Sequence, residues 1–338
     1  MRVAVTDGYG PPEVVRITDV PAPEVGPGDV RVAVHATTVN PTDCGTRAAK
    51  PFFIRALTGI VRPRTMILGN EFAGVVESVG PRVTRFSAGD RVFGYSPRFG
   101  AHAELVSISE DGPIAAVPAG RSFEDVAPGT EGAHYALSVI RKAGIDAGQD
   151  VLVNGATGAI GSAAVQLLAD LGARVSAVCG SAHVELVRGL GADRVIDRDA
   201  LDFTQEDHQY DVVFDAVGKE LDRTVPPGAK AVLKPRRLYL TTDLGLWSQN
   251  AVLPVLTRLA RGRQVMLPLP NREPGDRRVP ARTHRLRTVP PCDRPALPAR
   301  ADRRGLPVCR DRAEGRQRRH HCRGIRLPQL AQGQPSRE

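Results

Sequence analysis

The chain has 338 residues, of which 41% are hydrophobic, and this is enough for about two globular domains. No apolar run reaches the roughly 18 residues that a membrane span needs. The first residues have the pattern of a strand rather than of a signal peptide, so we expect a cytoplasmic protein without a membrane partner. The five cysteines are widely scattered and show neither metal-binding nor disulfide spacing.

The net charge of +9 is concentrated at the end of the chain. Residues 271–338 hold 18 Arg and seven acidic residues, a net charge of +11, which leaves −2 for residues 1–270. The same segment has nine Pro and no aromatic residue, so it cannot bury enough apolar surface to offset the entropy of ordering. We expect a disordered Arg/Pro-rich tail, either frameshifted from about Asn271 or a genuine basic segment. Nucleic-acid binding is not expected, because no aromatic side chains accompany the charge.

Short strands separated by Gly- and Pro-rich turns dominate the start of the chain. The expected strands are Arg2–Thr6, Val14–Asp19, Asp29–Thr38, Ala73–Val79, Arg91–Phe93 and Ala101–Ser107. Such spacing predicts a small barrel-like β-domain, to which we assign residues 1–122. A short helix is expected within Pro41–Thr58.

Beyond this region the pattern changes to helices and then to alternating strands and helices. Phe123–Ala143 predicts helices that are interrupted at Pro128-Gly129. The later expected elements are strands Val151–Asn154, Arg174–Cys179, Arg194–Ile196, Asp211–Ala216, Arg237–Thr241 and Gln264–Leu267, and helices Ala159–Leu171 and Val184–Leu190. This alternation predicts an α/β fold, with a doubly wound parallel sheet over residues 123–270.

A glycine turn joins the first of these strands to its helix. Its sequence is Gly155-Ala156-Thr157-Gly158-Ala159-Ile160-Gly161. Gly155 permits the sharp turn, Gly158 lets the backbone approach a pyrophosphate, and Gly161 lets the helix pack closely on the strand. The free N–H groups and dipole of the helix N-terminus then attract the phosphates. In this strand–turn–helix context the motif predicts nicotinamide-dinucleotide binding by residues 155 and 157–161.

The residues after the second strand of this domain indicate which nucleotide binds. The stretch Val178–His183 has no carboxylate to hold a ribose 2′-hydroxyl, as an NAD site usually has. Ser181 can donate a hydrogen bond to a 2′-phosphate, and His183 and Arg198 can add positive charge. We therefore expect NADPH rather than NADH. For His183 the alternative is an ordinary exposed helix residue.

With these motifs in place, the chain resembles the medium-chain dehydrogenase/reductase superfamily, in its zinc-free quinone-oxidoreductase-like branch. The matching segments are residues 9–14, 34–43, 68–76, 86–94, 155–161, 190–197 and 214–218. The resemblance implies a GroES-like first domain and a Rossmann-type second domain. It implies hydride transfer between NADPH and a quinone, enone or aldehyde, and contact of Ala216, Val217 and Gly218 with the nucleotide. It leaves a homodimer through the sheet edge near Gln264–Leu267 as an option. Apolar residues in the loop Lys50–Ile67 suggest a small apolar carbonyl or quinone substrate, but they fit a core equally well.

The resemblance also bears on metal binding. Where zinc-dependent members carry a Cys and a His ligand, this chain has Asn40 and Asn70. Asn is a poor zinc ligand beside thiolate and imidazole, and the four-Cys lobe of structural zinc is absent from the sequence. We therefore expect no metal.

In the absence of zinc, other groups have to polarise the substrate. Asn40 can donate a hydrogen bond to a carbonyl oxygen, and Asp43 is either a second catalytic residue or a turn cap. The proton would come from solvent, since no Tyr lies in the adjacent stretch Gly45–Ala48. The tail lacks the closing helix and strands of the family, so we expect low stability and reduced activity. The alternative function is a non-catalytic NADPH-binding sensor or structural protein.

Overall fold

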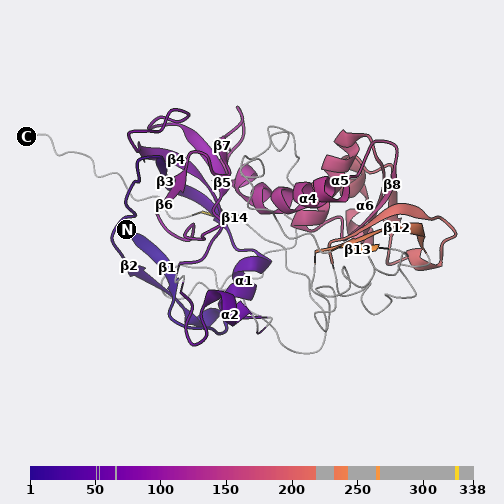
Figure 1. Cartoon of the computed structure of the whole chain (residues 1–338), viewed down its shortest axis with the longest axis horizontal. Coiled ribbons are helices and arrows are strands. Elements are labelled where there is room, and N and C mark those ends of the chain that lie inside the picture. The colour runs from indigo at the N-terminus through magenta and orange to yellow at the C-terminus, as the bar shows by residue number, and fades with distance from the viewer. Residues whose placement is uncertain are drawn as a thin grey trace, which may run out of the picture. The chain divides into compact units, whose positions relative to one another are not determined.

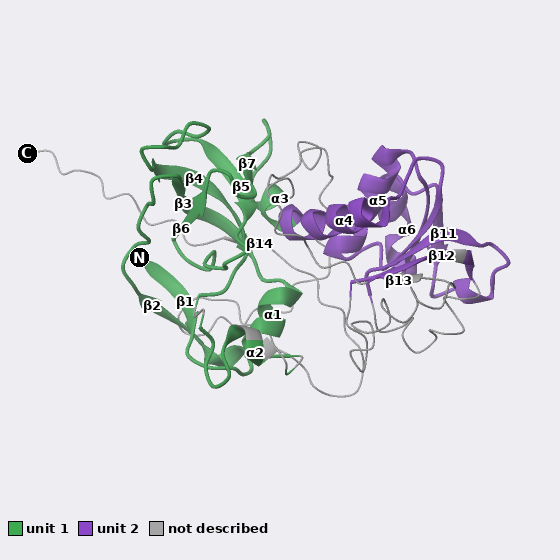
Figure 2. Cartoon of the chain, in the orientation of Figure 1, with its two compact units in different colours: residues 1–128, 292–338 green, residues 129–291 purple. Residues whose placement is uncertain are grey.

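The computed structural model describes residues 1–50, 52, 54–64, 67–217, 232–242, 264–266 and 324–326. Figure 1 shows the elements, and Figure 2 colours the two compact units into which the chain divides. Unit 1 is Met1–Pro128 with Cys292–Glu338, and unit 2 is Gly129–Pro291. The predicted boundary after residue 122 falls shortly before this division.

Unit 1 is mostly antiparallel sheet. Its strands are β1 (Arg2–Thr6), β2 (Val15–Asp19), β3 (Asp29–Thr38), β4 (Glu71–Val79), β5 (Arg91–Tyr95), β6 (Leu105–Ser109), β7 (Ile114–Ala116) and β14 (Gly324–Arg326). Its helices are η1 (Pro12–Val14), α1 (Pro41–Ala48), α2 (Ile54–Thr58) and α3 (Phe123–Val126). β1 pairs with β2, and the larger sheet runs β14-β3-β4-β5-β7.

Strand β3 is the centre of this larger sheet. β4 pairs along one of its edges, whereas the other edge is shared by two strands, with β6 opposite Asp29–Ala33 and β14 opposite Ala36–Thr38. Alternate residues Val30, Val32 and Val34 are buried and join one hydrophobic cluster, as the period of two of a strand requires. The end of β3 is thereby fixed immediately before α1.

Unit 1 departs from the predicted elements by shifts of one or two residues at some strand ends, by two helices where one was expected within Pro41–Thr58, and in three further details. The strand expected at Ala101–Ser107 begins only at Leu105, because the backbone of Ala101 and His102 bonds to Gly69 and Leu68 instead. The short strand β7 was not predicted. Within the tail, β14 is a strand where no strand pattern was recognised; its pairing with β3 is long-range and leaves no local signal.

Within its described residues, unit 2 is built on a six-stranded parallel sheet. Its strands are β8 (Asp150–Asn154), β9 (Arg174–Cys179), β10 (Arg194–Asp197), β11 (Tyr210–Asp215), β12 (Leu233–Thr241) and β13 (Gln264–Met266). Its helices are α4 (Thr130–Ala143), α5 (Ala159–Leu171) and α6 (Val184–Gly189), with single turns η2 (Ala127–Gly129) at the unit boundary, η3 (Ser181–His183) and η4 (Phe203–Gln205). The strand order is β10-β9-β8-β11-β12-β13, which confirms the doubly wound α/β prediction.

The strand order places the topological switch point between β8 and β11. Ligands of such sheets bind outside the carboxyl ends of the strands at this point. β8 is buried after its first residue and β11 along its whole length, and α5 packs on β8 and β9. β13 ends the sheet within the described residues; the homodimer through this edge stays a prediction.

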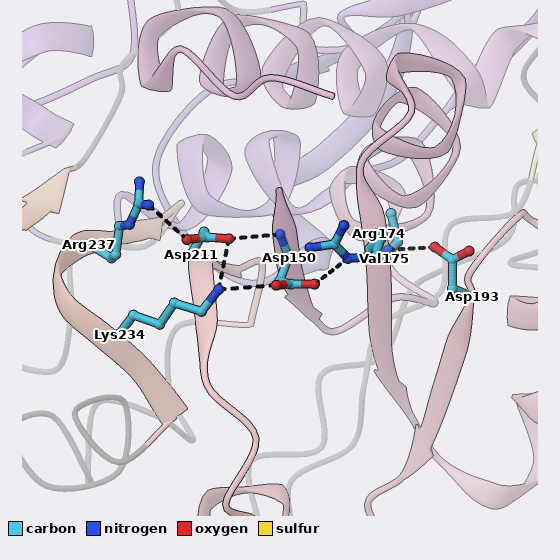
Figure 3. Close-up of polar contacts among 7 residues, drawn as sticks. All are labelled: Asp150, Arg174, Val175, Asp193, Asp211, Lys234 and Arg237. Carbon is cyan, nitrogen blue, oxygen red and sulfur yellow. Dashed lines mark hydrogen bonds and ion pairs between the residues drawn. The ribbon is translucent and has the colours of Figure 1, made fainter. Parts of the chain in front are cut away.

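Ion pairs link the amino-terminal ends of these strands, at the edge of the sheet opposite the switch-point site (Figure 3). Lys234 Nζ lies 3.1 Å from Asp150 Oδ2 and 3.0 Å from Asp211 Oδ2. Arg174 Nε donates to Asp150 Oδ1 at 2.6 Å, and Arg237 pairs with Asp211 at 3.1 Å. The hydrogen bond from Arg174, together with Lys234, lowers the pKa of Asp150 to about 2. The network therefore ties β8 to β9, β11 and β12 away from the predicted nucleotide site.

No helix among the described residues is both long and apolar enough to cross a membrane.

Candidate functional site

The glycine turn lies at the carboxyl end of β8, and its three glycines differ in what surrounds them. Gly155 has φ +84°, a left-handed conformation that favours glycine. A Cβ on Gly161 would lie 2.1 Å from the carbonyl oxygen of Gly155, so only glycine lets α5 approach this closely. Among the described residues, a Cβ on Gly158 would meet only that oxygen, at 3.5 Å. The protein thus leaves open space in front of Gly158, where a ligand could approach.

Gly158 is also the N-cap of α5. Its carbonyl accepts the first helical hydrogen bond, from Ser162 N at 2.8 Å. The N–H groups of Ala159, Ile160 and Gly161 precede that bond and so have no acceptor within the helix. Gly158 and Ala159 are exposed, and Thr157 and Ile160 are half-buried. These groups have the geometry that binds phosphate oxygens.

A buried carboxylate that the sequence analysis did not select adjoins this turn. Asp215 ends β11 with 0% exposure and accepts hydrogen bonds from Asn154 Nδ2 at 3.0 Å and Tyr239 Oη at 2.7 Å. It also accepts from Val217 N at 3.1 Å. These contacts fix the strand ends on both sides of the switch point. The sequence signal that could have identified Asp215 is a polar residue at the end of an apolar strand.

The same network positions part of the predicted nucleotide contact. Val217 N is held by Asp215, and a Cβ on Gly155 would lie 2.5 Å from Val217 Cγ2. The neighbouring Ala216 N donates to Asn154 O at 3.0 Å. The structure therefore brings Ala216 and Val217 to the glycine turn, whereas Gly218 lies outside the described residues.

The residues predicted to hold a 2′-phosphate lie after β9 and β10. Ser181 begins η3 and His183 ends it, and Arg198 follows β10. Between Ser181 and Arg198 lies a carboxylate that the sequence analysis missed, Asp199. Its Oδ2 accepts from Ser181 N at 3.0 Å, and its Oδ1 lies 3.7 Å from Arg198 Nε. The stretch Val178–His183 lacks a carboxylate, but the turn that follows the adjacent strand β10 supplies one.

In unit 1, Asn40 and Asp43 form the capping box of α1. Asp43 N donates to Asn40 Oδ1 at 3.1 Å, and Asn40 N donates to Asp43 Oδ2 at 3.2 Å. Asp43 Oδ1 accepts from Gly69 N at 2.9 Å. The geometry supports the capping alternative for Asp43, while a direct catalytic role remains a prediction.

The carboxyl group of Asp43 is almost fully buried. Its exposure is 2%, and His102 Nε2 lies 3.8 Å from Oδ2 while also contacting the carbonyl of Thr38 at 2.8 Å. Burial raises the pKa of Asp43, against the opposing influence of His102 and of the backbone hydrogen bonds. The cap thus ties α1 to the loop that carries Gly69 and Asn70.

The two asparagines predicted to stand at the positions of the family's zinc ligands contact each other. Asn40 Nδ2 donates to Asn70 Oδ1 at 2.6 Å, and both side chains are buried. Amide groups paired in this way do not fit a zinc site, which favours thiolate and imidazole. Across the described part of the chain, no three His, Cys, Asp or Glu residues are grouped to hold a metal ion.

Comparison with known proteins identifies the family. Residues 26–119 match the alcohol dehydrogenase GroES-like domain, and residues 159–229 match a family described as zinc-binding dehydrogenase. Mouse quinone oxidoreductase is 32% identical over 231 residues, which are 65% of this chain and 67% of the mouse protein. The chain belongs to the medium-chain dehydrogenase/reductase superfamily.

Other members of the superfamily are similar in sequence and in fold. The chloroplastic NADPH-dependent alkenal/one oxidoreductase of Arabidopsis thaliana is 28% identical over 245 residues, 69% of this chain and 62% of that protein. The quinone oxidoreductase structure of Coxiella burnetii has a TM-score of 0.66 at 26% identity and covers 81% of this chain and 84% of its own. The chain spans 55–62% of the plant and fungal reductases that it matches.

Proposed function

We propose that this chain is a zinc-independent, NADPH-dependent oxidoreductase that transfers hydride to a quinone or an α,β-unsaturated carbonyl compound. The observation that carries the proposal is the glycine turn at the switch point, where the backbone leaves space in front of Gly158 at the N-terminus of α5. The similarity to quinone and alkenal/one oxidoreductases supports the reaction class.

The nucleotide would be held mainly by unit 2. The N–H groups of Ala159, Ile160 and Gly161 would bind the pyrophosphate, and Ser181 and Arg198 would face the 2′-phosphate. Asp215 would act indirectly, because it holds Val217 against the turn. When bound, NADPH supplies the hydride for reduction of the substrate.

Asn40 would bind the substrate oxygen in unit 1. One N–H of its amide is bonded to Asn70, and an amide has a second N–H to donate. The Asn40 side chain is 3% exposed, so a substrate oxygen bound there would be shielded from water, which strengthens the hydrogen bond. As hydride adds to the substrate carbon, this donor would stabilise the charge on oxygen, and solvent would supply the proton.

We propose that Asp43 is a positioning residue rather than a catalytic one. Both of its oxygens accept backbone hydrogen bonds, one from Asn40 and one from Gly69. These bonds join the residue before α1 to the loop that carries Asn70. The Asn40–Asn70 pair is thereby held in one orientation.

The test is turnover of the purified chain with NADPH and a panel of quinones and enones, followed by the loss of NADPH absorbance. Oxidation of NADPH that depends on one of these substrates is the expected result. Binding of NADPH without turnover on any member of the panel would instead support the non-catalytic alternative. Absence of nucleotide binding would contradict both.

A further inference from the structure

Asp199 lies where the two groups proposed to bind the 2′-phosphate converge. Ser181 donates to Asp199 Oδ2 from its backbone N at 3.0 Å and from its Oγ at 3.5 Å. Arg198 Nε lies 3.7 Å from the other carboxylate oxygen. The hydroxyl and backbone N–H of Ser181 and the guanidinium of Arg198 therefore already contact a negatively charged group of the protein itself, the carboxylate of Asp199.

The position of Asp199 is set by the turn after β10. Asp199 N donates to Asp197 Oδ1 at 3.0 Å, and Arg198 N donates to Cys179 O at 3.0 Å. The second bond fastens the turn to the end of β9, beside η3. Asp199 itself is exposed, with 58% of its side chain accessible, so its carboxylate is available to a ligand.

This arrangement has opposite consequences for the two nicotinamide nucleotides. The donors that would bind a 2′-phosphate already contact Asp199, and the negative carboxylate repels the phosphate. A ribose 2′-hydroxyl can instead donate a hydrogen bond to a carboxylate in this region, as in NAD sites. The carboxylate therefore weakens NADPH binding and supports NADH binding.

We propose that Asp199 is a specificity-determining residue that competes internally with the 2′-phosphate and allows the chain to bind NADH as well as NADPH. The proposal rests on the nucleotide site proposed above. A unit charge about 4–5 Å from another changes a binding constant by roughly fivefold in water-like surroundings, and a 2′-phosphate carries up to two charges. Removal of the Asp199 charge should therefore strengthen NADPH binding by about tenfold or more.

The experiment measures dissociation constants by calorimetry for the full chain and for Asp199→Asn. The ligands are NADPH, NADH, adenosine 2′,5′-bisphosphate and 5′-AMP, which separate the 2′-phosphate from the nicotinamide. Asp207→Asn is the matched control, because it removes an exposed carboxylate of the same unit that lies outside the proposed site. In the parent, the constants for NADPH and NADH should differ by less than about tenfold.

Asp199→Asn should bind NADPH and adenosine 2′,5′-bisphosphate about tenfold more tightly, without tighter binding of NADH or 5′-AMP. Adding Ser181→Ala should remove part of that gain. An NADPH-to-NADH ratio within twofold of that of the parent would overturn the role of Asp199 while leaving the nucleotide site intact. Failure of the parent to bind either dinucleotide would overturn the proposed function itself.

Discussion

Asn40 has two separable tasks, because its Oδ1 caps α1 while its Nδ2 faces Asn70 and the proposed substrate oxygen. Asn40→Ala removes both tasks, so we expect about 1 kcal/mol lower stability and a fall in kcat/KM of about 100-fold. Asn40→Ser keeps a capping oxygen and removes the amide donor. It should recover the part of the stability that the cap provides, while it loses the bond to Asn70 and still loses kcat/KM.

Urea denaturation and steady-state kinetics on both variants provide the measurement. The dissociation constant of NADPH should stay unchanged, because the proposed nucleotide site lies in unit 2. Full activity of Asn40→Ser would show that the amide donates no hydrogen bond that stabilises the transition state.

Two substitutions in the glycine turn separate an effect on stability from an effect on nucleotide binding. Gly161→Ala places a methyl group 2.1 Å from Gly155 O, so it should lower the free energy of unfolding by about 1–3 kcal/mol. Gly158→Ala makes only an ordinary contact at 3.5 Å, so it should fold nearly normally. Its methyl group would occupy the space proposed for pyrophosphate, and the dissociation constant of NADPH should rise at least about tenfold.

Gly189→Ala is the control for these two variants. Nothing lies within 4 Å of the added Cβ, and the residue ends α6. Stability should hold or rise by up to about 1 kcal/mol, because Ala favours helix over Gly. Normal NADPH affinity in Gly158→Ala would argue against pyrophosphate binding at this turn.

At the scale of elements, the ion network at the amino-terminal ends of β8, β11 and β12 makes stability depend on pH. Asp150 has a folded pKa of about 2, below its ordinary value of 3.8. Its contribution to stability is therefore present above about pH 4 and is lost as the pH falls towards about 2. Below both values the carboxyl is protonated in the folded and the unfolded chain.

Asp150→Asn should accordingly lower the urea midpoint near neutral pH. The difference from the parent should shrink as the pH falls from about 4 to about 2. Because the pairs with Arg174 and Lys234 are partly exposed, the effect should be about 1 kcal/mol or less. Asp207→Asn, outside the network, serves as the control, and a difference that does not depend on pH would contradict the electrostatic explanation.

At the scale of the whole molecule, the tail contributes one described strand. β14 pairs with Ala36–Thr38 of β3, and Thr37 and Thr38 are buried. A chain that ends at Pro291 leaves this edge of β3 without that partner, so its unfolding free energy should fall by about 1–3 kcal/mol. Nucleotide binding by unit 2 should persist.

A chain that ends at Gln334 keeps β14 and is the matched control. Calorimetric melting of the two truncated chains and of the full chain distinguishes them. An unchanged melting temperature in the shorter chain would mean that β14 adds nothing to stability.

The frameshift hypothesis for residues after about Asn271 also belongs at this scale. It predicts that sequencing of the gene in independent isolates will reveal an alternative frame that encodes a closing helix and strands. The same uninterrupted frame in every isolate would contradict it.

Local patterns predicted most elements of both units, because alternation and helical spacing depend on neighbouring residues. Asp29–Thr38, Arg174–Cys179 and Ala159–Leu171 have their predicted bounds in the structure. The elements that were missed or displaced depend on distant partners. β14 needs β3, and the segment before Leu105 bonds to Leu68 and Gly69 rather than continuing the strand.

The sequence alone determined the strand–turn–helix of residues 151–171, since it follows from residue types at short spacing. Its motifs also carried the resemblance to the family to which the chain belongs. The resemblance also led to the prediction that Asn40 and Asn70 replace metal ligands. Only the tertiary structure showed that these amides bond to each other, that Asp215 fixes the switch point, and that Asp199 faces Ser181 and Arg198. Apart from the contact of Asp199 with its neighbour Arg198, these contacts join residues that packing, rather than sequence proximity, brings within hydrogen-bonding distance.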